Sequence, residues 1–542
     1  SIWFGTSVQH RWGVLIVSPD FTMPKELKTF TLEEVSKHKS AGDAWLVVDG
    51  GVYDCSRFAA SHPGGEMLLM EFAGQDATET FYGLHRQEVL DKYKARLLIG
   101  YIEGAKAPVD DGLSAWGRIS KVPYAETFAW RGFHSPYHTE QHKAFRKYIR
   151  EFFDREGIYQ EATESETSNE PCSLELMQKI SQAGLLHTKL GPGPHLALLP
   201  MPLGMKPEEY TYFHDKIIQE ETARMQTPGF VDSMFAGFTI GAPPLINYGT
   251  KEMKKTVLPE VLAGRKRIAL AITEAFAGSD VAGLRTTAVK SPDGTHYIVN
   301  GTKKWISSGT FADYFVTAVR TGGKGAAGIS MMLIPRVEGV ETKLIKTAYS
   351  SSAGTAYITF ENAMMPVENL MGKEGAGFKM IMANFNHERW VIAVSVNAGA
   401  RVVTEECFKW ASQRKVFGKP LMSQSVIREK LGMMVAAVES VDAYADLLTH
   451  QMCNMSYAEQ NEHLGGPISL LKYQSTRVAH LVADQAVQTF GGRGFTKTGM
   501  GRIVETFART YKAGAVYGGS EEIMVDLGVR QAMKFYPPNA KL

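Results

Sequence analysis

The chain has 542 residues, and its 59 Lys and Arg against 57 Asp and Glu give a formal charge of +2. Hydrophobic residues make up 44% and charged residues 21%, which excludes wholesale disorder, and the near-neutral balance gives no reason to expect a nucleic-acid partner. No apolar run approaches the roughly 20 residues that a membrane-spanning helix needs. The cysteines form no C-x-x-C pair, so we interpret them as isolated thiols in a reducing compartment. They are Cys55, Cys172, Cys407 and Cys453.

The two ends are set apart from the fold. Residues 1–29 are interpreted as an N-terminal tail, in which residues 1–22 are of uncertain origin because Met23-Pro24 could be the natural start. Residues 537–542 form a C-terminal tail that ends in Ala540-Lys541-Leu542, which resembles the S-K-L type of peroxisomal address. We expect a peroxisomal location on this basis, and otherwise a cytoplasmic or mitochondrial one, since such a tripeptide also arises by chance.

A small domain is expected over residues 30–103, where short strands such as Trp45–Val48 are broken by glycine-rich turns. His62 begins a His-Pro-Gly-Gly turn, and His85 follows 23 residues later. Imidazole is a good ligand for haem iron, and two of them would fill both axial positions. An iron without an open position is suited to electron transfer. The alternative is that both histidines are solvated surface residues, which the combination of motifs disfavours.

This domain resembles the cytochrome b5-type haem-binding domains. The shared motifs are Trp45-Leu46-Val47, Val52-Tyr53-Asp54, the His-Pro-Gly-Gly turn, Gly74-Gln75-Asp76-Ala77-Thr78 and Gly100-Tyr101-Ile102. The resemblance implies a small α+β fold, a haem b cofactor, and His62 and His85 as the axial iron ligands. Arg86 stands where the family usually has a small residue, which could alter the haem edge but not the ligation. Residues 104–114, rich in Pro, Gly and Asp, predict a linker.

The rest of the chain alternates between helical and strand patterns. Residues 115–267 are predicted to be helical, since apolar residues between His142 and Phe153 recur at the spacing of one buried helix face. Over residues 268–365, β-rich runs separated by Gly, Pro, Asp and Asn predict a β domain. Long helical patterns return over residues 366–536.

Several motifs in these three domains could line a cofactor. The segment Ile272–Asp280 stands at a strand-to-loop transition, and Lys303–Gly309 follows with small residues, hydroxyls and the flat side chain of Trp305. Together with Gln413–Pro420, Gln488–Phe495 and Val516–Ile523, in this order, they resemble the acyl-CoA dehydrogenases over about residues 116–535. The resemblance implies an all-α domain, a β-barrel-like domain and a C-terminal four-helix bundle, with FAD bound.

The resemblance also implies site residues. The expected FAD contacts are Ile272, Thr273, Gly278, Ser279, Trp305, Ser307, Ser520 and Glu522. Those expected to reach the FAD of a neighbouring subunit are Arg414, Phe417, Gln488, Gly491 and Gly492. Gln424, one place before the position of the family's usual Gln, is also expected to bind the cofactor. Contacts to the acyl-CoA are expected from Ser279, Arg389 and Gly519. A shared FAD requires at least a homodimer, and the family is usually tetrameric.

The reaction needs a carboxylate near the carbon α to the thioester carbonyl, in a dry site that raises its basicity. In much of the family this Glu follows the Tyr of a C-terminal Y-E-G-T motif, but here that place is Gly518, after Tyr517. The long-chain and isovaleryl branches place it on an earlier helix, just before an Arg. This position corresponds to Glu388, before Arg389, and we assign the base to Glu388. The alternative, an exposed helical Glu-Arg pair, is disfavoured because Gly518 opens the space that a carboxylate from another helix would need.

These features predict FAD-dependent dehydrogenation of an acyl-CoA to the trans-2-enoyl-CoA in fatty acid β-oxidation, with electrons relayed to the fused haem and on to an external acceptor of unknown identity. Three alternatives stay open at this point. They are a flavin monooxygenase that uses the haem in the reverse direction, an acyl-CoA oxidase, and a non-enzymatic haem-flavin electron carrier. The length and branching of the acyl group are not indicated.

Overall fold

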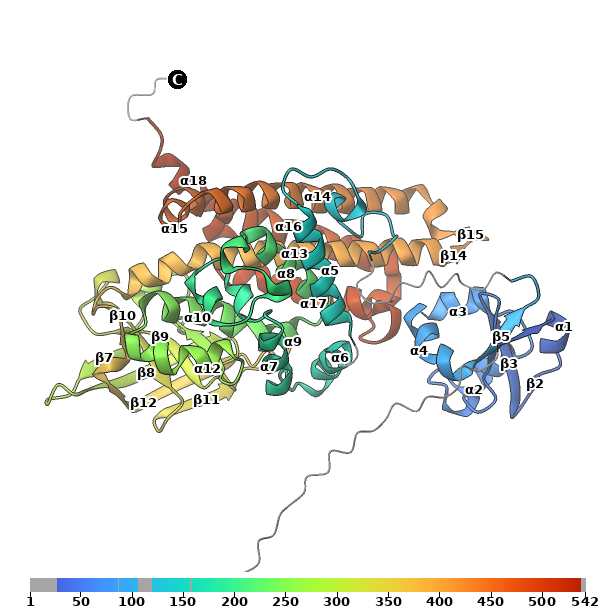
Figure 1. Ribbon diagram of the computed structural model, residues 1–542, viewed down its shortest axis with the longest axis horizontal. Helices are drawn as coiled ribbons and strands as arrows, with labels where there is room; N and C mark the ends of the chain where they lie inside the picture. The colour runs from blue at the N-terminus through green and yellow to red at the C-terminus, as the bar shows by residue number, and fades with distance from the viewer. Residues whose placement is uncertain (1–26, 86, 106–118, 156–157, 538–542) are drawn as a thin grey trace, which may run out of the picture. The chain divides into compact units, whose positions relative to one another are not determined.

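The computed structural model describes residues 27–85, 87–105, 119–155 and 158–537 (Figure 1). The chain divides into two compact units, residues Ser1–Asp111 and Gly112–Leu542, which are described separately. Most of the predicted tail 1–29, most of the linker 104–114, Arg86 and the C-terminal tripeptide lie outside the described residues. Within those ranges, no helix combines the length and the apolar character that a membrane crossing requires.

The first unit is a five-stranded sheet with small helices, and its strand order is β1-β5-β4-β3-β2. β3 and β4 form a hairpin, and the turn residues Asp49 and Gly50 have φ angles of 50° and 71°, as the favoured two-residue turns require. The elements are β1 (Lys28–Phe30), α1 (Leu32–Val35), β2 (Lys39–Ser40), β3 (Asp43–Val48), β4 (Gly51–Asp54), α2 (Glu66–Glu71), α3 (Thr78–Leu84), α4 (Gln87–Leu97) and β5 (Leu98–Ile102).

The second unit begins with helices. They are α5 (Glu140–Asp154), α6 (Ile158–Ser168), α7 (Leu174–Gln182), α8 (Tyr212–Ala223), α9 (Pro228–Val231), a π-helical turn (Asp232–Ala236), α10 (Gly237–Tyr248), α11 (Lys251–Thr256) and α12 (Leu258–Leu262). The predicted face of α5 is buried, with Phe145, Ile149 and Phe153 no more than 1% exposed. These side chains join α7, α8 and α10 in one apolar core.

An eight-stranded sheet follows, with the order β11-β12-β8-β7-β9-β10-β13 and with β6 paired to β9. Its strands are β6 (Ile268–Ala271), β7 (Thr287–Lys290), β8 (His296–Ile306), β9 (Tyr314–Arg320), β10 (Ile329–Pro335), β11 (Val340–Leu344), β12 (Ala356–Pro366) and β13 (Leu370–Met371). β9 and β10 carry almost continuous buried residues, so this part of the sheet is covered on both faces.

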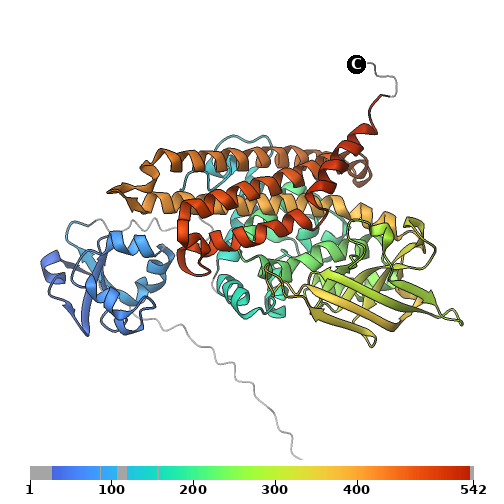
Figure 2. The same cartoon turned by 180° about the vertical axis from the view of Figure 1, so that it is seen from behind.

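Long helices complete the second unit (Figures 1 and 2). The elements are α13 (Gly377–Gln413), β14 (Lys415–Val416), β15 (Lys419–Pro420), α14 (Ser425–Asn454), α15 (Tyr457–Glu459), α16 (Gly465–Phe490), α17 (Arg502–Val516) and α18 (Glu521–Met533). α13, α14, α16 and α17 pack around a second apolar core, and α18 packs on α16. The sheet lies near the beginning of α13, whereas the β14–β15 hairpin lies at its end (Figure 1).

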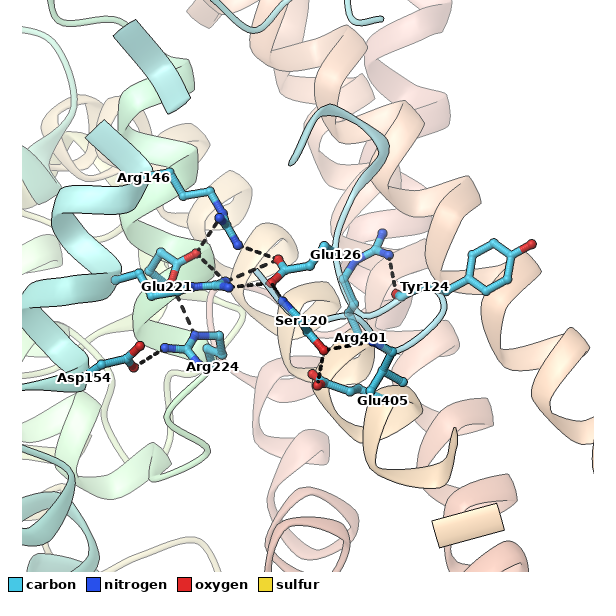
Figure 3. A network of polar contacts seen from close by, with 11 residues as sticks. Ser120, Tyr124, Glu126, Arg146, Asp154, Glu221, Arg224, Arg401 and Glu405 are labelled. Atoms are coloured by element: carbon cyan, nitrogen blue, oxygen red, sulfur yellow. Dashed lines mark hydrogen bonds and ion pairs between the residues drawn. The ribbon is translucent and has the colours of Figure 1, made fainter. Parts of the chain in front are cut away.

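Buried charges join the segment before α5 to the helices (Figure 3). Glu126 accepts hydrogen bonds from Arg146 and Arg150 of α5, and Arg150 Nε also donates to Glu221 of α8 at 2.7 Å. Ser120 donates to Glu405 of α13 at 2.7 Å. The charges compensate one another inside the protein, so removal of one partner would leave a buried ion unpaired.

Candidate active site and haem site

Glu388 lies on α13 with a half-buried side chain, and its Oε2 atom is enclosed and has no hydrogen-bond partner among the described residues. Burial raises the pKa of Glu388, and the nearby charges of Arg389, Lys472 and His387 oppose this increase. A carboxylate that is desolvated and lacks a partner for one oxygen is a stronger base than one in water.

Gly518 makes room for this carboxylate. A Cβ atom at position 518 would lie 3.4 Å from Glu388 Oε1 and only 2.5 Å from Ile392 Cδ1, and the φ angle of Gly518 is 65°. A larger residue would therefore meet the side chains of α13 and would also be strained in its backbone. The glycine that removes the usual base thus lies directly beside Glu388.

Two cations hold the loop that contains Gly518. Lys472 Nζ of α16 donates to the carbonyl of Gly519 at 2.6 Å, and Arg389 Nε donates to the carbonyl of Gly518 at 3.2 Å. Burial lowers the pKa of Lys472 to about 8, although the carboxylate of Glu388 favours its charged form. The predicted acyl-CoA contact Arg389 is 9% exposed, so in this structure it mainly positions the loop.

Three polar groups lie near one another between this loop and the π-helical turn. Burial raises the pKa of Tyr517 and of Asp232, and the neighbouring hydroxyl of Tyr349 opposes the increase in both. Burial raises the pKa of Asp232 to about 7. Asp232, Tyr349 and Lys472 come from three distant segments, and no sequence motif indicated them. The one local signal would have been a charged residue in the apolar stretch before α10.

Hydrogen bonds from Lys303 and Lys304 of β8 fix the predicted cofactor loop, Ile272–Asp280. Lys303 Nζ pairs with Glu274 at 2.8 Å and donates to the carbonyl of Ile272 at 3.0 Å, and Lys304 N donates to that of Thr273 at 2.8 Å. Gly278 and Ser279 face solvent, Ser307 is half-buried, and Trp305 is 52% exposed with a φ angle of 64°. The strand ends therefore present an aromatic face and hydroxyls to a ligand.

The predicted cofactor residues fall into two separate groups. Glu388 lies in the first third of α13, whereas Arg414 follows its last residue, roughly 38 Å further along the axis at 1.5 Å per residue. Near that far end, Phe417 is 95% exposed, Gln424 is half-buried, and Gln488, Gly491 and Gly492 are exposed. Ser520 and Glu522 instead lie at the start of α18, close to Gly518.

The residues of both groups fit a flavin dinucleotide. Added Cβ atoms at Gly491 and Gly492 would meet no atom within 4 Å, so this backbone can be approached closely. The exposed guanidinium of Arg414 suits a pyrophosphate, because its planar fork matches phosphate oxygens. At the other group, Trp305 offers a wall for a flat ring.

The two histidines of the first unit face each other. The ring centres of His62 and His85 lie 6.0 Å apart. Metal–imidazole bonds of roughly 2 Å on either side of one iron would put two axial rings about 6 Å apart. His62 Nδ1 bonds to the carbonyl of Gly65 at 3.0 Å, which leaves Nε2 for a metal. A Cβ at Gly64 would lie 2.9 Å from His62 Cε1, which explains the glycine of the motif. The residues therefore fit a haem with two axial histidines.

A cavity of about 570 Å³ borders α13, but the side chain of Glu388 does not line it. Asn384 and His387 contribute to its walls, together with residues of α10 and the segment around Met452.

Family models match both units. The description "Cytochrome b5-like Heme/Steroid binding domain" matches residues 31–103. The N-terminal, middle and C-terminal domains of acyl-CoA dehydrogenase match residues 139–265, 269–363 and 375–533. Both resemblances inferred from the motifs, and the expected fold class, are confirmed.

Known proteins resemble the second unit over almost their whole length. The acyl-CoA dehydrogenase apdG of Emericella nidulans is 41% identical over 435 residues, which cover 78% of this chain and 98% of the relative. The mitochondrial long-chain specific acyl-CoA dehydrogenase of Rattus norvegicus is 30% identical and covers 72% of this chain and 86% of the relative. The crystal structure of acyl-CoA dehydrogenase from Geobacillus kaustophilus has a TM-score of 0.64 at 27% identity and covers 74% of this chain and 100% of that one.

Proposed function

Since the chain belongs to the acyl-CoA dehydrogenase family and carries a cytochrome b5-like domain before it, we propose that it oxidises an acyl-CoA to the trans-2-enoyl-CoA, as in fatty acid β-oxidation, and passes the electrons to its own haem domain. The family binds FAD, and the first unit is a haem-binding domain. The observation that carries the proposal is the enclosed carboxylate of Glu388 beside Gly518.

Glu388 takes the proton from the α carbon of the acyl group onto its carboxylate. A bound FAD would supply the acceptor for the hydride of the β carbon, so loss of the proton and the hydride would leave a double bond between the α and β carbons. Desolvation of Glu388 favours its protonated form and therefore promotes the transfer. The positive charges of Arg389 and Lys472 oppose this increase in pKa and favour the ionised form that accepts the proton.

The two groups of cofactor residues support an oligomer. A flavin placed beside Glu388 would lie far from Arg414 of the same chain, because roughly 38 Å of helix separates these two residues. The exposed ring of Phe417, at the tip of the β14–β15 hairpin, is suited to contact a second copy. Family members are typically oligomeric, and we propose a homotetramer, with a dimer as the minimum.

The haem domain is proposed to receive electrons from the flavin domain. His62 and His85 would hold the iron from two sides, and a haem held in this way would supply single-electron transfer rather than oxygen binding. The predicted linker of residues 104–114 tethers the domains, and a short tether raises the effective concentration of one for the other to the millimolar range. The external acceptor of these electrons is not indicated by the chain.

Anaerobic mixing of the oxidised holoenzyme with acyl-CoAs of different chain lengths tests both parts. We expect bleaching of the flavin band followed by reduction of the haem bands. Glu388→Gln should abolish both signals with FAD retained, whereas Glu429→Gln, an exposed control on α14, should change neither. Failure of every acyl-CoA to bleach the flavin would overturn the dehydrogenation. Bleaching without haem reduction would overturn only the relay.

A further inference from the structure

The cavity of about 570 Å³ beside α13 has the size of a ligand site, since small-molecule pockets measure roughly 300–1,000 Å³. Apolar side chains from two helices contribute to its walls, among them Pro243 and Ile246 of α10 and Met452 of α14. The cavity is therefore a candidate for binding an apolar group.

The polar side chains in these walls do not require a polar ligand. His387 Nε2 bonds to the carboxylate of Asp215 at 2.7 Å. The hydroxyl of Tyr210 and the amide of Gln460 donate to main-chain carbonyls at 2.8 and 2.9 Å. The ring of His195 also contributes to the lining, but its Nε2 atom, which has no partner among the described residues, is enclosed by protein. These contacts favour an apolar occupant.

The inner end of the cavity lies close to the catalytic base. Asn384 lines the cavity, and it lies one turn before Glu388 on the same face of α13. One turn rises about 5.4 Å, and helical side chains lean towards the N-terminus, so the side chain of Glu388 leans towards Asn384. In the other direction the space is filled, because a Cβ atom at Gly518 would lie 2.5 Å from Ile392 Cδ1. A chain that starts at Glu388 therefore continues along α13 towards Asn384.

A hydrogen bond joins α10 and α13 between the base and the cavity. Pro244 in α10 has no N–H to donate to the carbonyl of Ile240, so that carbonyl is left without its helical partner. Asn384 Nδ2 donates to it instead, at 3.0 Å. Both residues are half-buried, and the net value of such a bond is modest because each group can bond to water instead. An entering acyl chain can therefore displace this bond.

The outer end of the cavity opens to water. Cys453 at the end of α14 and Tyr457 of α15 belong to its lining and are exposed, as is Asn247 of α10. The hydroxyl of Tyr457 donates to the carbonyl of Ala383 at 2.8 Å, which attaches this rim to α13. The cavity thus extends from the catalytic helix to solvent.

We propose that this cavity is an outlet for the acyl chain, so that the substrates are long-chain acyl-CoAs whose distal end reaches water. This inference rests on the proposed function. A chain that extends beyond Asn384 displaces its hydrogen bond to Ile240. The middle of the chain then lies between Pro243 and Met452, and its end lies beside Cys453. The outlet has no closed end, so a polar group at the end of the chain is tolerated.

Protection of Cys453 tests where the chain ends. The other cysteines, Cys55, Cys172 and Cys407, are buried and serve as internal references. FAD-loaded Glu388→Gln is treated with N-ethylmaleimide and butyryl-, octanoyl- or palmitoyl-CoA. Binding is followed by the flavin absorbance, and labelling by peptide mass spectrometry. At about ten times its Kd, palmitoyl-CoA should slow the labelling of Cys453 about tenfold, whereas bound butyryl-CoA should not slow it.

Kinetics distinguish an outlet from a closed pocket. For flavin reduction in the wild type, ω-hydroxypalmitoyl-CoA should match palmitoyl-CoA in kcat/KM within about threefold, because its hydroxyl lies in water, whereas an enclosed, unpaired hydroxyl would cost more than about tenfold. Ile246→Trp narrows the cavity and should lower the palmitoyl-to-butyryl ratio of kcat/KM at least about tenfold. The control Val289→Trp enlarges an exposed side chain of β7 outside the cavity and should leave this ratio unchanged.

Palmitoyl-CoA that perturbs the flavin spectrum without protecting Cys453 would overturn the inference and leave the proposed function intact. A penalty of more than about tenfold for the ω-hydroxyl group would likewise overturn the outlet. If Ile246→Trp does not fold, the labelling of Cys453 decides, because it needs no substitution in the cavity. If no acyl-CoA perturbs or reduces the flavin, the proposed function itself is overturned.

Discussion

Substitution of Gly518 by alanine is predicted to disable the base without removing it. The new Cβ atom would lie 2.5 Å from Ile392 Cδ1 and 3.4 Å from Glu388 Oε1, at a φ angle of 65°. The left-handed backbone costs an alanine about 1–2 kcal/mol, and overpacking typically adds about 1–3 kcal/mol. Part of this strain can be relieved by displacing α13 and the carboxylate. Since a shift of about 1 Å can cost roughly 100-fold in rate, we expect single-turnover flavin reduction to slow by about that factor.

The assay is rapid anaerobic mixing with saturating acyl-CoA, together with thermal unfolding and FAD content. The double variant Gly518→Ala/Ile392→Ala is the control, because it removes the 2.5 Å clash but not the backbone strain. It should recover most of the rate and little of the stability. An unchanged rate in Gly518→Ala would refute the argument that this glycine makes room for Glu388.

Three further predictions concern other parts of the molecule. Lys472→Met removes a positive charge near Glu388 and the hydrogen bond to the carbonyl of Gly519. The apparent pKa of Glu388 should therefore rise, and the acidic limb of the pH–rate profile for flavin reduction should move to higher pH. A limb that does not move would contradict the electrostatic role of Lys472. His62→Ala should abolish the absorbance of axially ligated haem but leave flavin reduction by acyl-CoA unchanged, and retained haem spectra would exclude His62 as a ligand. Burial lowers the pKa of five described histidines to about 3–4, below the ordinary value of about 6.5, so the unfolded chain binds protons first as the pH falls. Stability should therefore be complete above about pH 6.5 and decrease towards pH 4, by up to about 1.4 kcal/mol per pH unit for each histidine, and a constant Tm between pH 7.5 and 5 would contradict this. These histidines are His138, His142, His187, His195 and His214.

Local motifs predicted the parts of the site that depend on short segments. The His-Pro-Gly-Gly turn indicated His62, and the replacement of the usual Glu by Gly518 directed attention to Glu388 on another helix. The turn around His62 is determined locally by residue types and spacing, whereas the assignment of Glu388 also needed the resemblance to the long-chain and isovaleryl branches of the family.

The residues that sequence reasoning missed are joined by the tertiary fold. Lys472 of α16 donates to the loop of Gly518, and Tyr349, from the connection between β11 and β12, lies near both Tyr517 and Asp232 of the π-helical turn. The π-helical turn has no simple periodic pattern, and a lysine on a long helix is usually solvated. Only the packing of α10, α13 and α16 brings these groups together.

The central claim, that Glu388 removes the α proton, is tested most directly by exchange of that proton with solvent. A 3-thia-acyl-CoA, which carries sulfur at the β position and cannot lose a hydride there, is incubated with the holoenzyme in D₂O and followed by NMR. Exchange at the α carbon should be rapid in the wild type and absent in FAD-loaded Glu388→Gln. Exchange at the wild-type rate in that variant would show that another group is the base.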